Sequence, residues 1–297
     1  MTGGYRALRE GAAWLDLSGR GLLRLTGADR ARLLHAMTTN HIQQMKPGDW
    51  CYAFFLNSQG RILSDAYVLC REEEFWLDVE PARRQFVYEH LDHYIIADDV
   101  TVEDLSGDYA AIAVEGPAET APRFAGLSAA GISVTGQPAV RLYPRAEEKA
   151  RLIAELEAKG IHLAAGADAE VVRLEHARPR YGVDFSEAQI PHETRLLHAV
   201  HFSKGCYLGQ EIVERVRSRG HANRLLAQIF IEGREAPAAG AKLRAGGAEA
   251  GEITSAAYSP ALQRCVALGY LRAAHAKAGT ELECGGRRAV VSERPPS

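Results

Sequence analysis

The last quarter of the chain restricts the fold more than any other stretch. From Arg224 onward, short runs rich in apolar residues alternate with glycine-containing turns. Runs of this length and spacing predict strands joined by tight turns, and several in succession favour a small barrel. We predict strands at residues 225–231, 241–245, 251–255, 266–271, 281–283 and 287–291, and a frayed tail over residues 295–297. The sequence therefore predicts a first part over residues 1–222 and a C-terminal β-barrel over residues 223–297.

Strands and helices mix in the first part of the chain. Residues 50–56 are apolar on both faces and predict a central strand, and a turn at residues 57–60 leads into a second strand over residues 61–69. Pro81 predicts the first position of a helix that reaches about residue 94. Further helices are predicted at residues 146–159 and 169–178 and from residues 115–118 onward. This mixture favours an α+β fold built from two interleaved lobes.

Charge and cysteine content narrow the class of protein. The 297 residues carry a net charge of −3, which gives no overall field for nucleic acid or an anionic membrane. Five scattered cysteines without a Cys-x-x-Cys pair argue against a disulfide framework and a self-contained metal site, and favour a reducing compartment. The sequence has no leader pattern and no run of roughly 20 apolar residues. We therefore expect a cytoplasmic protein with no metal and with neither nucleic acid nor a membrane as partner.

Packing alone does not account for residues 204–211, which read Lys-Gly-Cys-Tyr-Leu-Gly-Gln-Glu. A free thiol with a pKa of about 8.5 is only about 3% ionised at neutral pH unless a cation or a helix N-terminus lowers that pKa. Lys204 and a helix that opens at Gly209 could supply both to Cys206. Gly205 and Gly209 would allow positive φ and the close approach of a ligand. The alternative is a tight turn in which Cys206 fills a packing gap.

The same eight residues resemble the signature of the YgfZ family, folate-binding proteins linked to iron–sulfur cluster assembly and repair. That family is related to the T-protein, the aminomethyltransferase of the glycine cleavage system. The resemblance implies a T-protein-like, multi-lobed folate-binding fold in which the C-terminal barrel closes a ring of lobes around a folate-sized channel. It also implies tetrahydrofolate or a derivative as the bound cofactor, and iron–sulfur proteins or cluster-assembly factors as partners.

The resemblance further implies where the pterin ring binds. Arg-Leu-Glu at residues 173–175, followed by residues 181–184, is similar to the family segment whose glutamate holds the pterin. A carboxylate can accept two N–H donors from one pterin edge, so Glu175 is a predicted ligand contact. The alternatives for Glu175 are a solvated helix face or an ion pair with a neighbouring arginine.

The hairpin of residues 57–69 gives a second comparison. T-proteins carry paired aspartates on the returning strand, and one of them is thought to act in aminomethyl transfer. Here the pair reads Ser64 and Asp65. A serine cannot hold a negative charge beside a developing iminium or ammonium centre, so Ser64 argues against transfer chemistry. We keep Asn57 and Asp65 as predicted folate contacts, with a solvated strand residue as the alternative for Asp65.

A basic stretch follows the motif. Arginines stand at positions 215, 217, 219 and 224 with no acid among residues 215–224. A solvated linker is one interpretation. Next to a folate site, Arg215 and Arg219 would bind the carboxylates of a glutamyl tail, while Gln210 and Glu211 would reach the ligand from the first helical turn. The stretch lacks the interleaved aromatic residues that nucleic-acid binding favours.

Three functions fit these patterns. The first is a tetrahydrofolate-binding accessory protein for iron–sulfur cluster assembly or repair, with Cys206 as its functional thiol and Lys204 beside it. One cysteine cannot hold a cluster, which needs about four ligands, so the thiol would act on or with a partner. The second is a folate-dependent aminomethyltransferase or other one-carbon transfer enzyme. The third is a folate-binding protein without catalysis, in which Cys206 only packs.

Overall fold

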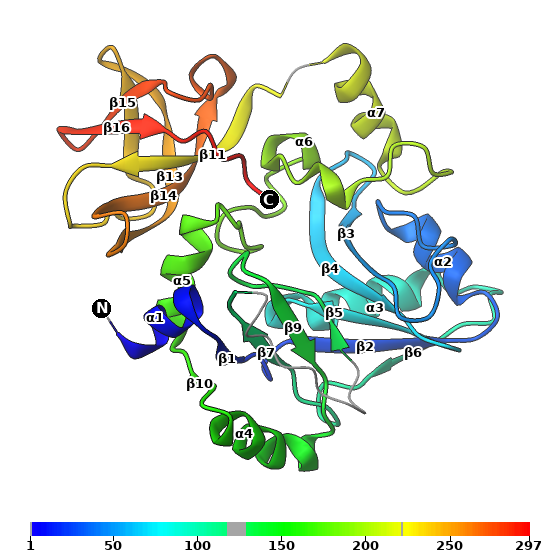
Figure 1. Cartoon of the computed structure of the whole chain (residues 1–297). Coiled ribbons are helices and arrows are strands. Elements are labelled where there is room, and N and C mark those ends of the chain that lie inside the picture. Colours follow the sequence, from blue (N-terminus) through cyan, green and yellow to red (C-terminus); the bar gives the residue numbers. More distant parts are fainter. Residues whose placement is uncertain (1, 118–128, 221) are drawn as a thin grey trace.

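The computed structural model describes residues 2–117, 129–220 and 222–297, and only the main chain of residues 129, 130 and 219. Within these residues the chain forms two five-stranded sheets and a closed six-stranded barrel (Figure 1). The prediction of an α+β fold with a C-terminal β-barrel is confirmed. The chain begins in one sheet, builds the other and then returns to the first, because β1 and β7 to β10 share a sheet that excludes β2 to β6.

One sheet has the strand order β3-β4-β5-β2-β6, with all neighbouring strands antiparallel. Its strands are β2 (Gly21–Thr26), β3 (Trp50–Leu56), β4 (Ile62–Cys70), β5 (Phe75–Val79) and β6 (Thr101–Asp104). Apolar side chains of α2 (Arg30–Met37) and α3 (Arg84–Tyr94) cover one face, and η1 (Pro81–Arg83) leads into α3 as Pro81 predicted. The opposite face carries the aromatic side chains of Tyr52, Phe54, Tyr67 and Trp76 and packs towards the centre of the molecule.

The other sheet has the order β10-β1-β7-β9-β8. Its strands are β1 (Ala13–Asp16), β7 (Ile112–Glu115), β8 (Ala129–Ala130), β9 (Ala139–Leu142) and β10 (His162–Leu163). One face packs on α1 (Gly3–Glu10) and α5 (Gly166–Glu175), and the other on α4 (Lys149–Ala158), which follows η3 (Ala146–Glu148).

A connecting segment leads from α5 to the barrel through α6 (Pro191–Thr194), η4 (Leu197–Ala199) and α7 (Gln210–Arg219). The barrel closes in the order β11-β14-β13-β12-β15-β16. Its elements are β11 (Arg224–Ile231), β12 (Lys242–Ala245), β13 (Ala248–Ser259), β14 (Arg264–Arg272), η5 (Ala273–His275), β15 (Glu281–Cys284) and β16 (Arg287–Val291). After β16 the chain turns back, so its last residue lies between the barrel and α6 (Figure 1).

Two predicted elements differ in the structure. Residues 50–56 form β3, but β3 is an edge strand rather than a central one. It is apolar on both faces because each face packs in a different apolar cluster. Residues 38 and 39 cover its free edge: the Thr39 N–H donates to the Phe54 carbonyl, and the Thr39 hydroxyl accepts from the Phe54 N–H. The helix predicted at residues 169–178 is α5, which begins and ends three residues earlier. The helix predicted to open at residues 115–118 falls on residues that lie outside the described part of the chain from 118 onward.

Candidate functional site

A cavity lies where the two sheets, the segment after α5 and the last residue of the chain meet. Asp65 and Tyr67 of β4 line it together with Tyr52 of β3 and Arg141 of β9. The other lining residues are Arg20, Glu80, Ser133, Val134, Arg173, Arg178, Pro179, Arg180, Leu196 and Ser297. The cavity volume is about 40 Å³. Pockets for drug-sized ligands enclose ~300–1,000 Å³, so this conformation leaves room for a few water molecules and not for such a ligand.

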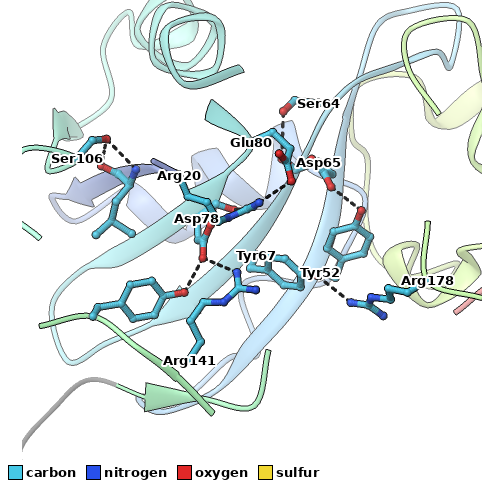
Figure 2. A network of polar contacts seen from close by, with 12 residues as sticks. Arg20, Tyr52, Ser64, Asp65, Tyr67, Asp78, Glu80, Ser106, Arg141 and Arg178 are labelled. Atoms are coloured by element: carbon cyan, nitrogen blue, oxygen red, sulfur yellow. Dashed lines mark hydrogen bonds and ion pairs between the residues drawn. The ribbon is translucent and has the colours of Figure 1, made fainter. Parts of the chain in front are cut away.

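Asp65 brings an unsatisfied carboxylate oxygen into this cavity. Its Oδ2 accepts a hydrogen bond from the Tyr52 hydroxyl at 2.6 Å, whereas its Oδ1 is buried and has no hydrogen-bond partner among the described residues (Figure 2). The residue is 5% exposed. Burial raises the pKa of Asp65 to about 6, although the Tyr52 hydrogen bond and the charge of Arg20 oppose the shift. A buried acceptor without a donor costs about 1–3 kcal/mol, and groups of this kind are concentrated at functional sites.

Ser64 faces away from the cavity. Successive residues of a strand point to opposite faces, so β4 directs Asp65 and Tyr67 to the cavity and Ser64 to the face that α2 and α3 cover. Ser64 is fully buried, and its hydroxyl donates to the Asp65 carbonyl at 3.0 Å. The sequence argument that Ser64 removes a carboxylate from the site is therefore wrong, because a carboxylate at position 64 would not face the cavity.

A second buried carboxylate, Asp78 of β5, binds two of the arginines that line the cavity. It accepts from the Arg20 Nε, from the Arg141 Nη1 at 2.7 Å and from the Tyr143 hydroxyl at 2.8 Å (Figure 2). Glu80 accepts from the Arg20 Nη1 at 2.5 Å. Burial works against ionisation, but the charges of Arg20 and Arg141 hold the pKa of Asp78 below its usual value. Sequence reasoning missed this network, although an acid in the otherwise apolar strand of residues 75–79 was a signal for it.

Arg178 differs from the other arginines of the cavity wall. Its Nη2 donates to the Tyr67 hydroxyl at 2.8 Å and its Nη1 to the main-chain oxygen of Ser297 at 3.0 Å. Within the described part of the chain no Asp or Glu carboxylate lies within ion-pair distance of it, whereas the other four arginines of the lining each have one. A planar guanidinium without a carboxylate partner suits a ligand that carries a carboxylate.

Glu175 does not line the cavity. Its Oε1 accepts from the hydroxyls of Tyr5 and Ser259, both at 2.5 Å, and its Oε2 accepts from the Arg9 Nη1 at 3.0 Å. These partners lie on α1 and on β13 of the barrel, so the buried carboxylate joins both to α5. The hydrogen bonds of Glu175 in this structure go to the protein, at a junction between structural units, and they do not favour the expected pterin contact, which remains a prediction.

Replacing Glu175 by alanine is expected to destabilise the fold by about 2–4 kcal/mol, because two hydroxyls and a guanidinium lose their acceptor. Tetrahydrofolate affinity should change little. Chemical denaturation and a ligand titration on the same samples check both statements. Glu155→Ala is the matched control, since Glu155 lies on the surface of α4 in a long ion pair with Arg151. A Glu175→Ala protein with normal stability and weakened tetrahydrofolate binding would show that Glu175 contacts the ligand.

Lys204 binds the end of α2 and so holds in place the loop of residues 204–209. Its buried ammonium donates to the main-chain oxygens of His35, Thr38 and Asn40, in the last turn of α2 and just beyond it, where helix carbonyls lack intrahelical partners. Burial lowers the pKa of Lys204 to about 7, while three acceptors favour the ammonium because only that form has three N–H donors. The predicted role beside Cys206 is therefore corrected, since the charge of Lys204 is directed into α2.

The two glycines of the motif differ. Gly209 has a φ of +83°, and an added Cβ would lie 2.5 Å from the carbonyl oxygen of Asn57, so the hairpin turn at Asn57 packs against the start of α7. Gly205 does not have a positive φ, and an added Cβ would meet only His35, at 3.9 Å. The positive φ that the two glycines would allow is adopted at Gly209 and not at Gly205. Asn57 belongs to the turn and is not part of the cavity lining.

Cys206 is exposed on this loop and does not line the cavity. Three other cysteines are buried and Cys51 is half-buried. The alternative in which Cys206 fills a packing gap is therefore wrong. Lys204, Tyr207, Leu208 and Gly209 contact the body of the molecule, while the thiol of Cys206 lies at the surface.

The remaining predicted contacts lie on α7, which opens at Gly209 as predicted. Glu211 and Arg215 form an exposed ion pair of 2.5 Å, and neither they nor Gln210 line the cavity. The side chain of Arg219 lies outside the described part of the chain. Ligand contacts at these positions remain predictions.

The described residues contain no group of three or more His, Cys, Asp or Glu side chains placed to hold a metal ion. None of the helices described here is both long and apolar enough to cross a membrane. The groups that the cavity offers to a ligand are the carboxylates of Asp65 and Glu80, the tyrosine hydroxyls and the guanidinium groups of its wall.

Family models match both ends of the chain. The model described as GCVT N-terminal domain matches residues 2–121, and the model described as Glycine cleavage T-protein C-terminal barrel domain matches residues 224–296. The second match covers the closed barrel. The two matches agree with the relation to T-proteins that the sequence signature implied.

Similar proteins extend this relation over the whole chain. The aminomethyltransferase of Streptomyces coelicolor is 32% identical over 307 aligned residues, which cover 93% of this chain and 82% of that protein. The aminomethyltransferase of Synechococcus sp. (strain CC9311) is 28% identical and covers 98% of this chain, with 89% of that protein aligned. The crystal structure of glycine cleavage system aminomethyltransferase T from Bartonella henselae gives a TM-score of 0.88 at 21% identity, over 99% of this chain and 88% of that one. This likeness confirms the predicted T-protein-like fold.

Proposed function

The chain belongs to the glycine cleavage T-protein family, and on this premise we propose that it binds tetrahydrofolate or a derivative beside Asp65 and acts as a one-carbon transferase of the aminomethyltransferase type. The observation that carries the proposal is the buried, unpartnered Oδ1 of Asp65 in the cavity lining. Tyr52 holds Oδ2 and leaves Oδ1 for the ligand. The relatives named aminomethyltransferase support the reaction class.

Asp65 has the properties that this chemistry needs. A carboxyl group whose pKa is about 6 can exchange a proton near neutral pH. When ionised and fixed in a cavity sheltered from water, it stabilises a developing iminium or ammonium centre. Because Ser64 faces the helices, the site needs no carboxylate at position 64.

The charges of the cavity wall support a folate-like ligand. Five arginines and two side-chain carboxylates line the cavity, and Arg178 is the arginine without an Asp or Glu partner among the described residues. Folates carry carboxylates on their glutamyl tail, and a guanidinium can bind a carboxylate through two parallel hydrogen bonds. We therefore propose Arg178 as a ligand contact, in place of Glu175.

A second function has its own observation. The exposed thiol of Cys206 on a braced loop supports the role that the YgfZ-like signature implies, an accessory protein for iron–sulfur cluster assembly or repair. In that case folate would bind in the cavity, and Cys206 would act on iron–sulfur proteins or cluster-assembly factors at the surface. The thiol and Asp65 would then belong to different steps, since Cys206 is not part of the cavity lining.

One experiment separates the two functions. Purified protein is mixed with tetrahydrofolate and a labelled aminomethyl donor, and label transfer is measured for the wild type and for Cys206→Ala. The proposal expects transfer by both proteins, because Cys206 lies outside the cavity. Binding without transfer would contradict the transferase function. The rescue of iron–sulfur enzyme activity by Cys206→Ala in cells lacking the protein would then decide the second candidate, which predicts no rescue.

A further inference from the structure

The last residues of the chain return to the cavity instead of fraying. After β16 the Arg294 Nη1 donates to the Glu175 carbonyl at 3.2 Å, and Pro296 is buried. The Ser297 N–H donates to the Ala177 carbonyl at 3.2 Å, and the main-chain oxygen of Ser297 accepts from Arg178. Figure 1 shows this end of the chain between the barrel and α6. The prediction of a frayed tail is therefore wrong.

The tail occupies the contact with Arg178 that we propose for a ligand. Ser297 is part of the cavity lining, and its oxygen binds Arg178, the lining arginine that has no Asp or Glu partner in the described part of the chain. With the tail in place, the cavity volume is about 40 Å³. That volume is well below the ~300–1,000 Å³ of pockets for drug-sized ligands, so a folate cannot enter this conformation.

The contacts of the tail are few and replaceable. Pro295 and Pro296 have no N–H to donate, and residues 295–297 are held by the two main-chain hydrogen bonds of Ser297 and the burial of Pro296. The Ser297 oxygen occupies the Arg178 Nη1, and a guanidinium can bind a ligand carboxylate through two charge-assisted hydrogen bonds. The tail and a ligand carboxylate therefore compete for the same guanidinium.

We propose that residues 295–297 form a removable plug: they close the cavity at Arg178 in the ligand-free protein and leave when an anionic ligand binds there. This inference rests on the proposed function, because it takes a folate as the ligand. When only a fraction of the molecules is open, the apparent affinity for the ligand falls to that fraction of its intrinsic value. With about one molecule in ten open, binding would be about tenfold weaker.

The test compares the full chain with a chain that lacks residues 295–297, using tetrahydrofolate titrations. We expect the shortened chain to bind about tenfold more tightly. Pro296→Gly keeps the length of the tail and loosens its fit, so it should fall between the two. Thermal unfolding of all three proteins shows whether the barrel is intact, and Pro296→Gly still answers the question if the shortened chain does not fold.

Three outcomes are distinguishable. Tighter binding by both altered chains supports the plug. Equal or weaker binding by both overturns the plug and leaves the folate site in place. Absence of tetrahydrofolate binding by all three folded proteins overturns the plug and the proposed function together.

Discussion

Replacing Asp65 by asparagine is expected to abolish one-carbon transfer and, above pH 6, to make the folded protein more stable. Asparagine keeps the shape of the side chain, and its carbonyl oxygen can still accept from the Tyr52 hydroxyl at the position of Oδ2. It has no negative charge to stabilise a cationic centre and no proton to exchange. Removing one preorganised electrostatic group or general base typically lowers kcat by about 10²–10⁴-fold.

The stability gain follows from the raised pKa of Asp65. Burial raises this pKa from 3.8 to about 6, so between these values the folded protein keeps a proton that the unfolded chain has released. Stability of the wild type therefore falls as the pH rises through this window, and the full cost persists above it. Two pKa units correspond to about 3 kcal/mol. Asp65→Asn should recover about this amount at pH 7 to 8 and nothing below about pH 4.

Denaturation curves across this pH range and transfer assays at pH 7 check the two effects together. Ser64→Ala is the matched control, because Ser64 is the preceding residue of β4 but faces α2 and α3. It should leave transfer unchanged and show the wild-type dependence of stability on pH. An Asp65→Asn protein that transfers normally, or one that is less stable at pH 8, would contradict the role of Asp65.

Replacing Asp184 by alanine is expected to cost about 3–5 kcal/mol of stability, because it removes the fully buried one of the two carboxylates that pair with the buried guanidinium of Arg173. Asp184 Oδ2 accepts from the Arg173 Nη1 at 2.8 Å, and the side chains of both residues are at most 1% exposed. Its Oδ1 accepts from the hydroxyls of Thr254 and Ser255, which belong to β13 of the barrel. The Asp184 carboxylate thus neutralises the charge of Arg173 on α5 and holds the barrel against that helix.

Urea denaturation of three proteins measures this contribution. Asp184→Asn keeps an acceptor for the barrel hydroxyls and loses the charge, so its stability should lie between those of the wild type and Asp184→Ala. Glu170→Ala is the control. Glu170 also pairs with Arg173 but is more exposed than Asp184, so its removal should cost less stability. A loss below about 1 kcal/mol for Asp184→Ala would show that the pair is not a main link between the barrel and α5.

The sequence predicted the features that depend on residues close together in the chain. Alternating apolar runs and glycine turns located the barrel strands, Pro81 marked the start of a helix and Gly160 the end of another. The hairpin that carries Asp65 was predicted from its turn at residues 57–60. In each case a period, a cap or a turn residue acts over a few positions, so the local pattern is sufficient.

The site depends on contacts between distant residues, which the sequence does not reveal. Glu175 had the residue type for a pterin contact, but Tyr5 and Ser259 approach it from elements 170 and 84 positions away. Lys204 had the charge to lower a thiol pKa, but the carbonyls at the end of α2 bind that charge. Ser64 and Asp65 looked equivalent as a pair, although the alternation of a strand separates them. The return of Ser297 to Arg178 had no local signal.

The most direct test of the account is a crystallographic difference map of the protein with tetrahydrofolate. We expect ligand density against the Oδ1 of Asp65, where the two sheets, the segment after α5 and the last residue meet. Tetrahydrofolate ordered at another place, such as beside Glu175 or Cys206, with the Asp65 cavity unchanged, would contradict it.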